Sequence, residues 1–172
     1  HEGPWTAVDQ RIWGLDITTG EAWKIRPKQG KESFGHEYWY ADGIHIGYHG
    51  STNEGKKIIG HIKYDNSDFA EVAFPFDTGH THSLDSQLIV GDAGKHIRLW
   101  WWNEDEYEYE GPYNLCEHRC SMNVQILHVH PRITPDGRQV LYTSDSSGYG
   151  NIYLADLPEG EKVRTLPYLL WE

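Results

Sequence analysis

Cysteine is scarce in this sequence: Cys116 and Cys120, four positions apart, are the two that occur. No second pair accompanies them, so the residues for a four-cysteine zinc site or a disulfide framework are missing. We therefore interpret both as ordinary thiols. Unpaired thiols are typical of a reducing compartment, which predicts a cytoplasmic location.

Long apolar runs are missing as well. No segment approaches the roughly 20 apolar residues that a membrane-spanning helix requires. The opening residues, HEGPWTAVDQ, also lack the basic and then apolar layout of a signal peptide. We therefore expect no membrane partner. Because the sequence starts without methionine, we expect it to belong to a longer protein or to have been processed.

Basic residues are outnumbered in the chain. There are 15 Lys and Arg against 26 Asp and Glu, which gives a formal net charge of -11. A general nucleic-acid binder needs Lys and Arg clustered along one face. The charge balance therefore argues against a nucleic-acid partner.

Sustained helical periodicity is also absent, whereas Gly, Trp and Tyr are abundant, at 18, 8 and 11 residues. This balance favours an all-β chain with many tight turns. Four segments have the pattern of a β-hairpin, in which aliphatic or aromatic residues close on a small or acidic turn. They are residues 11–25, 58–74, 98–115 and 151–166.

Similar strands precede three of these hairpins, near Ile44, Leu88 and Val140. Their spacing, about 44 and then about 52 residues, brackets the roughly 40 to 50 residues of a propeller blade. We therefore predict a β-propeller with about four blades, the first without its inner strands. Residues 1–172 are expected to form the C-terminal part of a single propeller domain, whose open ends would favour self-association. A β-sandwich is the alternative fold.

Imidazoles gather just upstream of the three repeated strands. His36 precedes the first strand, His80 and His82 precede the second, and Gln125, His128 and His130 precede the third. Because equivalent loops of a propeller converge at one end of its channel, these side chains are expected to be neighbours. Solvated polar side chains are the simpler alternative.

The donor types limit the metals that such a site would hold. His128 and His130, two apart in an extended segment, would project to the same side, whereas Gln125 would need a bend to join them. Three imidazoles and one amide carbonyl suit Mn²⁺, Fe²⁺, Zn²⁺ or Ni²⁺. The residues by themselves do not distinguish among these ions.

The segments DQRIWGLD, GHEYWYADG, SLDSQLIVGD and QILHVHPRITPDGRQVLYTSD occur in this order along the chain. In these segments the chain resembles the C-terminal portion of the oligogalacturonate lyases, whose fold is a seven-bladed propeller. The resemblance implies a Mn²⁺ site formed by His80, Gln125, His128 and His130. His82 stays open as an alternative to His80, although His80, three residues before Ser83, matches the family better.

The same resemblance implies that His36 is the catalytic base and that Arg11 binds the substrate carboxylate. The chain departs from the family in two respects: the N-terminal blades are missing, and one residue is deleted between Ser83 and Asp85. The implied reaction is β-elimination from oligogalacturonides to give 4,5-unsaturated uronides. Two other functions stay open, a non-catalytic protein-binding scaffold and a metal-dependent hydrolase at the same residues.

Overall fold

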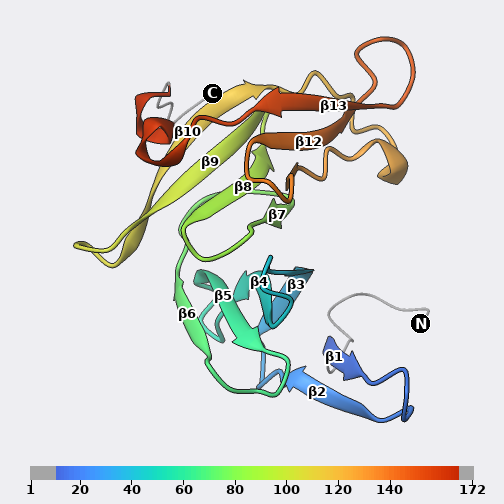
Figure 1. The fold of residues 1–172 in the computed structure, drawn as a ribbon, viewed down its shortest axis with the longest axis vertical. Helices are drawn as coiled ribbons and strands as arrows, with labels where there is room; N and C mark the ends of the chain where they lie inside the picture. Colours follow the sequence, from blue (N-terminus) through green and yellow to red (C-terminus); the bar gives the residue numbers. More distant parts are fainter. Residues whose placement is uncertain (1–10, 167–172) are drawn as a thin grey trace. The chain divides into compact units, whose positions relative to one another are not determined.

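The chain is almost entirely β-structure in a computed structural model that describes residues 11–166 (Figure 1). The described strands form four antiparallel sheets, in the orders β1-β2, β3-β4-β5-β6, β7-β8-β9-β10 and β11-β12-β13. Each sheet joins strands that are consecutive in the chain, which is the topology of a propeller blade. The prediction of an all-β chain is confirmed. The described chain divides into two compact units at Pro75 and Phe76.

The first unit contains two of the sheets. Its strands are β1 (Ile12–Leu15), β2 (Ala22–Arg26), β3 (Ser33–Trp39), β4 (His45–Ser51), β5 (Lys57–Lys63) and β6 (Ala70–Ala73). Aromatic and β-branched side chains of these strands form one core, in which Tyr48 of β4 is fully buried. The Tyr48 hydroxyl donates to Glu71 Oε1 at 2.7 Å, and Arg26 Nε donates to the same oxygen at 2.9 Å. This ion pair offsets the cost of placing a carboxylate beside the core.

The second unit contains the other two sheets. Its strands are β7 (Thr81–His82), β8 (Leu88–Ala93), β9 (His96–Asn103), β10 (Glu108–Glu117), β11 (Arg132–Ile133), β12 (Gln139–Ser144) and β13 (Asn151–Asp156). Two 3-10 helices, η2 (Gln125–Leu127) and η3 (Gly160–Thr165), complete it. Val90, Leu99 and Val140 are fully buried in a core that both sheets share. The packing of both sheets against one core places β7 close to β11.

The hairpin predicted over residues 151–166 is wrong. Only β13 is a strand, and the chain then turns into η3. Leu157 N still donates to Arg138 O at 2.8 Å, but Pro158, which has no N–H, follows directly. The 3-10 turn then buries Val163 completely in the core of the unit. Apolar burial thus takes the place of a return strand.

The three repeated strands near Ile44, Leu88 and Val140 are the second strands of their sheets. They correspond to β4, β8 and β12, and a further strand pairs with each of them, β3, β7 and β11 respectively. His36 accordingly lies within β3 rather than in a loop. Because β7 and β11 are only two residues long, they leave no alternating pattern in the sequence.

Candidate metal centre

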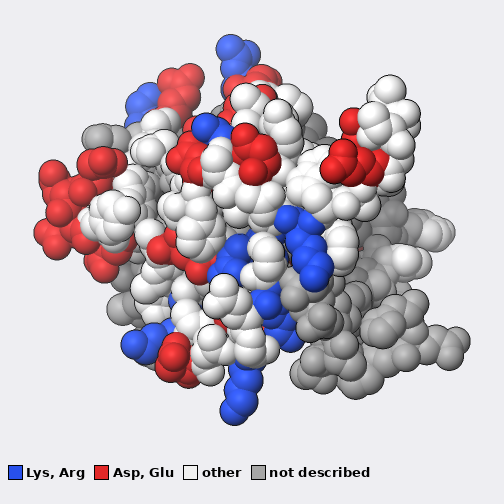
Figure 2. Space-filling model, turned by 90° about the horizontal axis from the view of Figure 1, so that it is seen from below, with Lys and Arg blue, Asp and Glu red and all other residues white. Residues whose placement is uncertain are grey.

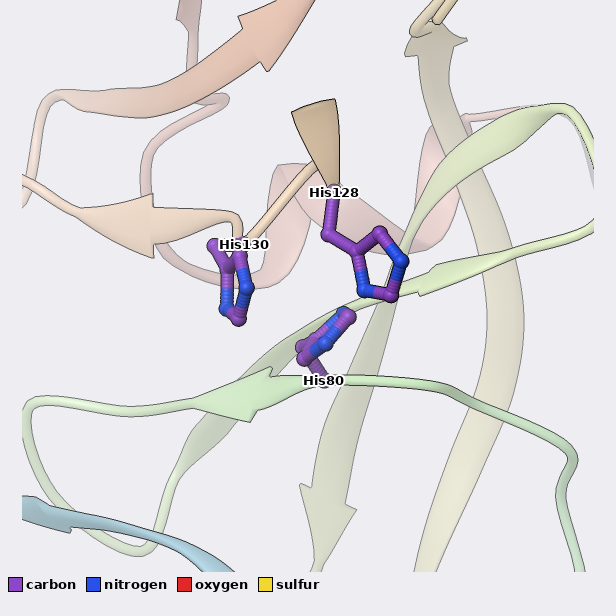
Figure 3. A group of neighbouring side chains, drawn as sticks. All are labelled: His80, His128 and His130. Atoms are coloured by element: carbon purple, nitrogen blue, oxygen red, sulfur yellow. The ribbon is translucent and has the colours of Figure 1, made fainter. Parts of the chain in front are cut away.

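Three of the predicted metal ligands lie together in the second unit. His80, His128 and His130 each offer one nitrogen, and these three atoms all lie within 4.8 Å of one another. The ring centroid of His80 is 5.3 Å from that of His128 and 3.8 Å from that of His130. Figure 3 shows the rings turned toward a common space, with His80 just ahead of β7 and the other two between η2 and β11.

The segment that carries His128 and His130 is anchored through the residue between them. Val129 is fully buried, and its carbonyl accepts a hydrogen bond from Thr143 N of β12 at 2.9 Å. The predicted extended segment is correct for His128, with φ -64° and ψ 144°, but His130 has φ +42°. A left-handed conformation is costly for a residue with a Cβ, so it points to a constraint at this position.

Gln125 begins the 3-10 helix η2, which ends one residue before His128. The chain thus turns between Gln125 and His128, where a fourth ligand from Gln125 was predicted to need a bend. The Cys120 thiol donates to Leu127 O at 2.6 Å, and Ser121 N donates to Asp145 Oδ1 at 2.7 Å. The first bond ties the end of η2 to Cys120, and the second ties the segment before η2 to the end of β12. Gln125 lies three residues before His128 in the sequence, and its role as a metal ligand remains a prediction.

His80 is held by a buried carboxylate. Asp92 Oδ2 lies 2.6 Å from His80 Nδ1, and Asp92 Oδ1 accepts the His80 backbone N–H at 2.7 Å. Burial by itself would raise the pKa of Asp92, but the hydrogen bonds from His80 outweigh it and lower that pKa. Asp92 is therefore a charged acceptor in a site that solvent hardly reaches.

His82, the alternative to His80, has a different position. It is not part of the three-histidine cluster, and its Nδ1 accepts a hydrogen bond from Ile133 N at 3.2 Å. Burial and the charge of Arg132 lower the pKa of His82 to about 4. A neutral His82 thus connects β7 to β11. The geometry favours His80 as the third imidazole of the cluster.

The chemistry of the three imidazoles fits a divalent metal ion. Within the part of the chain that the structure describes, this is the one group of His, Cys, Asp or Glu with such spacing. The buried Nδ1 of His128 has no hydrogen-bond partner among residues 11–166. Burial and the neighbouring His80 also lower the pKa of His130, which favours the neutral imidazole that a metal needs.

Arg11 and His36, the two predicted catalytic residues, belong to the first unit. Arg11 Nε donates to Glu37 Oε1 at 2.7 Å, and His36 Nδ1 lies 2.9 Å from His49 Nε2. His36 has φ +51°, where the register between β3 and β4 shifts. Such a bulge redirects a side chain out of the regular alternation of a strand.

A cavity of about 400 Å³ opens beside Arg11 in the same unit. Its lining includes Glu37 and the aromatic rings of Trp13 and Trp39, both of which are more than half exposed. Aromatic faces beside an arginine are suited to a sugar ring that carries a carboxylate.

The charged side chains of the surface are mixed. On the face drawn in Figure 2, blue Lys and Arg side chains lie among red Asp and Glu side chains.

Comparison with known proteins identifies the family. The family described as Oligogalacturonate lyase matches residues 1–161 of the chain. The chain belongs to the oligogalacturonate lyase family. Its relatives include an oligogalacturonate lyase of Dickeya dadantii, 28% identical over 92% of this chain and 46% of the relative. An oligogalacturonide lyase of Pectobacterium atrosepticum is also 28% identical over the same shares.

Solved oligogalacturonate lyase structures share the fold. The enzyme of Vibrio parahaemolyticus superposes with a TM-score of 0.71 at 31% identity, over 92% of this chain and 45% of that one. An oligogalacturonate lyase in complex with manganese gives 0.70 at 29% identity, over 92% and 44%. The predicted propeller class is thereby confirmed. The chain spans about half the length of the relatives it matches.

No helix in residues 11–166 is long and apolar enough to cross a membrane.

The sequence analysis missed three residues that contact the predicted site residues: Asp92, His49 and Glu37. Asp92 left a signal, since it is the one charged residue in the apolar strand LIVGDA.

Proposed function

We propose that this chain takes part in the β-elimination of oligogalacturonides, with Mn²⁺ held by His80, Gln125, His128 and His130. The observation that carries the proposal is the convergence of three imidazoles within 4.8 Å in a chain of this family. A solved relative that matches over 92% of the chain is in complex with manganese. When bound, the metal supplies a Lewis acid that draws electrons from the uronate carboxylate.

The reaction needs such an electron sink. The proton on C5 of galacturonate is weakly acidic, because its removal adds negative charge next to a carboxylate. Arg11 contributes a fixed positive charge whose planar fork matches carboxylate oxygens. Glu37 Oε1 accepts a hydrogen bond from Arg11 Nε, and this ion pair holds the guanidinium in a fixed orientation.

His36 is the proposed base. Its Nδ1 lies 2.9 Å from His49 Nε2, so one of these two nitrogens carries the shared hydrogen. When His36 Nδ1–H donates to His49, His36 Nε2 carries the lone pair that would take the C5 proton. The electrons of the C5–H bond then form the C4–C5 double bond, and the C4–O bond breaks. The departing oxygen leaves as an alcohol after it gains a proton, so no water is consumed.

A direct assay tests the proposal. Oligogalacturonides are added to the protein with and without Mn²⁺, and absorbance near 230 nm reports the unsaturated uronide. Metal-dependent growth of this absorbance is expected. New reducing ends without this absorbance would indicate a metal-dependent hydrolase, and no reaction together with no metal binding would indicate a scaffold.

Residues 1–172 are proposed to form part of a single propeller domain. The chain matches about half the length of its relatives, and each described sheet has the strand order of a blade. Within the described residues β1 pairs with β2 alone, and Trp13, Leu15 and Ile17 nearby are exposed. An exposed edge with apolar side chains favours self-association, which light scattering on the 172-residue chain measures.

A cytoplasmic location is also part of the proposal. Cys116 and Cys120 are both free thiols, as expected in a reducing compartment. Fractionation of cells that express the protein tests this location.

A further inference from the structure

Asp92 combines two properties that rarely occur together, a negative charge and nearly complete burial. Its exposed fraction is 3%, and it lies in β8 among Ile89, Val90 and Ala93, which are themselves buried. A buried carboxylate destabilises a fold unless it is paired and hydrogen-bonded. Both of its oxygens meet His80, one at the ring and the other at the backbone. Both carboxylate oxygens of Asp92 are therefore directed at one residue, His80.

The hydrogen bond between the two side chains determines where His80 carries its proton. An ionised carboxylate can only accept, so the hydrogen in the 2.6 Å contact must belong to His80 Nδ1. In a neutral imidazole the other nitrogen, Nε2, then carries the lone pair. Asp92 itself is outside the group of three side chains whose donor atoms converge.

From this geometry we infer that Asp92 is a positioning residue, which fixes His80 in the tautomer and orientation needed to bind a metal through Nε2. The inference rests on the proposed metal site. Carboxylates behind metal-binding histidines orient the ring and strengthen it as a ligand. Asp92 would thus influence the metal without touching it.

The backbone around the pair is shaped to allow this contact. Gly79 N donates to Asp92 O at 2.9 Å, which extends the pairing of β7 with β8 up to His80. A Cβ on Gly79 would lie only 2.8 Å from Asp92 Oδ1. Glycine therefore permits the carboxylate to reach the backbone of His80. We expect a larger residue at position 79 to displace Asp92.

Asp92→Asn tests whether Asp92 positions the His80 ring or only fills space, because Asn has nearly the same shape as Asp. If the carbonyl oxygen of the introduced Asn still accepts the hydrogen bond from the His80 backbone N–H, the NH₂ group of the same side chain faces His80 Nδ1. A donor at that place favours the Nε2–H tautomer, which cannot bind metal through Nε2. Mn²⁺ affinity is expected to fall by roughly 10- to 100-fold, the range seen when such outer partners are removed.

The experiment has two readouts on the 172-residue chain. Long-range ¹H–¹⁵N correlation spectra of the metal-free ¹⁵N-labelled protein give the tautomer of each histidine, and His80→Ala assigns the His80 signals. Calorimetric titration with MnCl₂ gives the affinity. Glu71→Gln is the matched control, since Glu71 is a partly buried carboxylate that bonds Arg26 and Tyr48 rather than a histidine of the cluster.

The expected result is Nδ1–H for His80 in the wild type, with the tautomer shifted and the affinity lowered in Asp92→Asn but not in Glu71→Gln. An Nε2–H tautomer in the wild type overturns the inference, and so does unchanged affinity in Asp92→Asn. If Asp92→Asn does not fold, the tautomer of His80 in the wild type still tests the inference. If the wild type shows the Nδ1–H tautomer but binds no Mn²⁺, the proposed metal site fails while the positioning of His80 by Asp92 stands.

Discussion

His36 and His49 form a direct imidazole pair, with Nδ1 of the first 2.9 Å from Nε2 of the second and ring centroids 4.7 Å apart. The pair joins β3 to β4 at the bulge where His36 takes its left-handed conformation. One nitrogen of His36 is thereby engaged within the protein. Under the proposal that His36 is the base, Nε2 is the nitrogen that would take the substrate proton when Nδ1–H donates to His49.

Replacing His36 by Ala is expected to lower turnover by about 10²-fold or more and to leave Mn²⁺ bound, because a base is needed for chemistry but not for coordination. Initial rates at 230 nm and metal content measure the two effects. His45→Gln, at another histidine of the same unit, is the control. Loss of metal from His36→Ala would show that His36 is a ligand instead.

Substitutions at the cluster are expected to weaken Mn²⁺ binding to different degrees. His128→Ala and His130→Ala each remove an imidazole, so each should reduce affinity by more than the roughly 10- to 100-fold lost with an outer partner. Gln125→Ala should have a smaller effect, because an uncharged amide oxygen is a weaker donor than imidazole to most divalent transition metals. Calorimetric titration gives the order, and Gln125→Ala without any effect would remove Gln125 from the ligand set.

His82 is predicted to matter for stability rather than for metal binding. His82→Ala leaves the buried Ile133 N–H without its acceptor, which costs about 1 to 3 kcal/mol of unfolding free energy. Urea denaturation measures the loss, and Mn²⁺ titration of the same protein should give nearly the wild-type affinity. If His82→Ala abolished metal binding while His80→Ala did not, the two roles would have to be exchanged.

Local stability in the first unit should depend on pH through His45. Its Nδ1 lies 2.5 Å from Asp42 and its Nε2 3.1 Å from Asp68. Burial by itself would lower the pKa of His45, but these hydrogen bonds outweigh burial and raise it. A raised pKa means that the stabilisation is complete below the unfolded pKa of about 6.5 and is lost as pH rises through the folded value.

Further groups surround His45, including the Tyr40 ring at 5.9 Å. Lys63 Nζ lies 3.1 Å from the same Asp68 oxygen, and His61 packs against the His45 ring at 5.5 Å. Burial and the charge of His45 lower the pKa of His61, so its contribution is lost in the opposite direction, as pH falls below about 6.5. Hydrogen exchange of β4 and β5 amides, corrected for intrinsic rates, should show weaker protection at pH 8.5 than at pH 6.5. His45→Gln should abolish this difference, and a persisting difference would contradict the assignment.

Much of the fold was predictable because several hairpins close on small or acidic turns between apolar strands. The turns at residues 16–21 and 104–107 are rich in acidic and polar residues and lie between strands with aliphatic and aromatic residues, so β1-β2 and β9-β10 were evident in the sequence. The edge strands β7 and β11 were not, since two residues carry no period. The segment after β13 was misjudged because burial of Val163 in a 3-10 turn resembles the apolar pattern of a strand.

The sequence indicated which residues form the site but not which neighbours each of them contacts. Spacing ahead of repeated strands indicated His80, His128 and His130, and the structure brings these three together. The choice between His80 and His82 depends on which ring meets Asp92 and which meets the Ile133 amide. These contacts join residues that are far apart in the sequence, so no local sequence pattern predicts them.

The most direct test of the account is Mn²⁺ binding by the wild-type chain and by the double variant His128→Ala/His130→Ala, measured by elemental analysis after dialysis and by calorimetric titration. The wild type is predicted to retain Mn²⁺ at a single site, and the double variant to lose it while its β-rich circular dichroism persists. Full metal content in the double variant would contradict the assignment of the three imidazoles, and with it the proposed function.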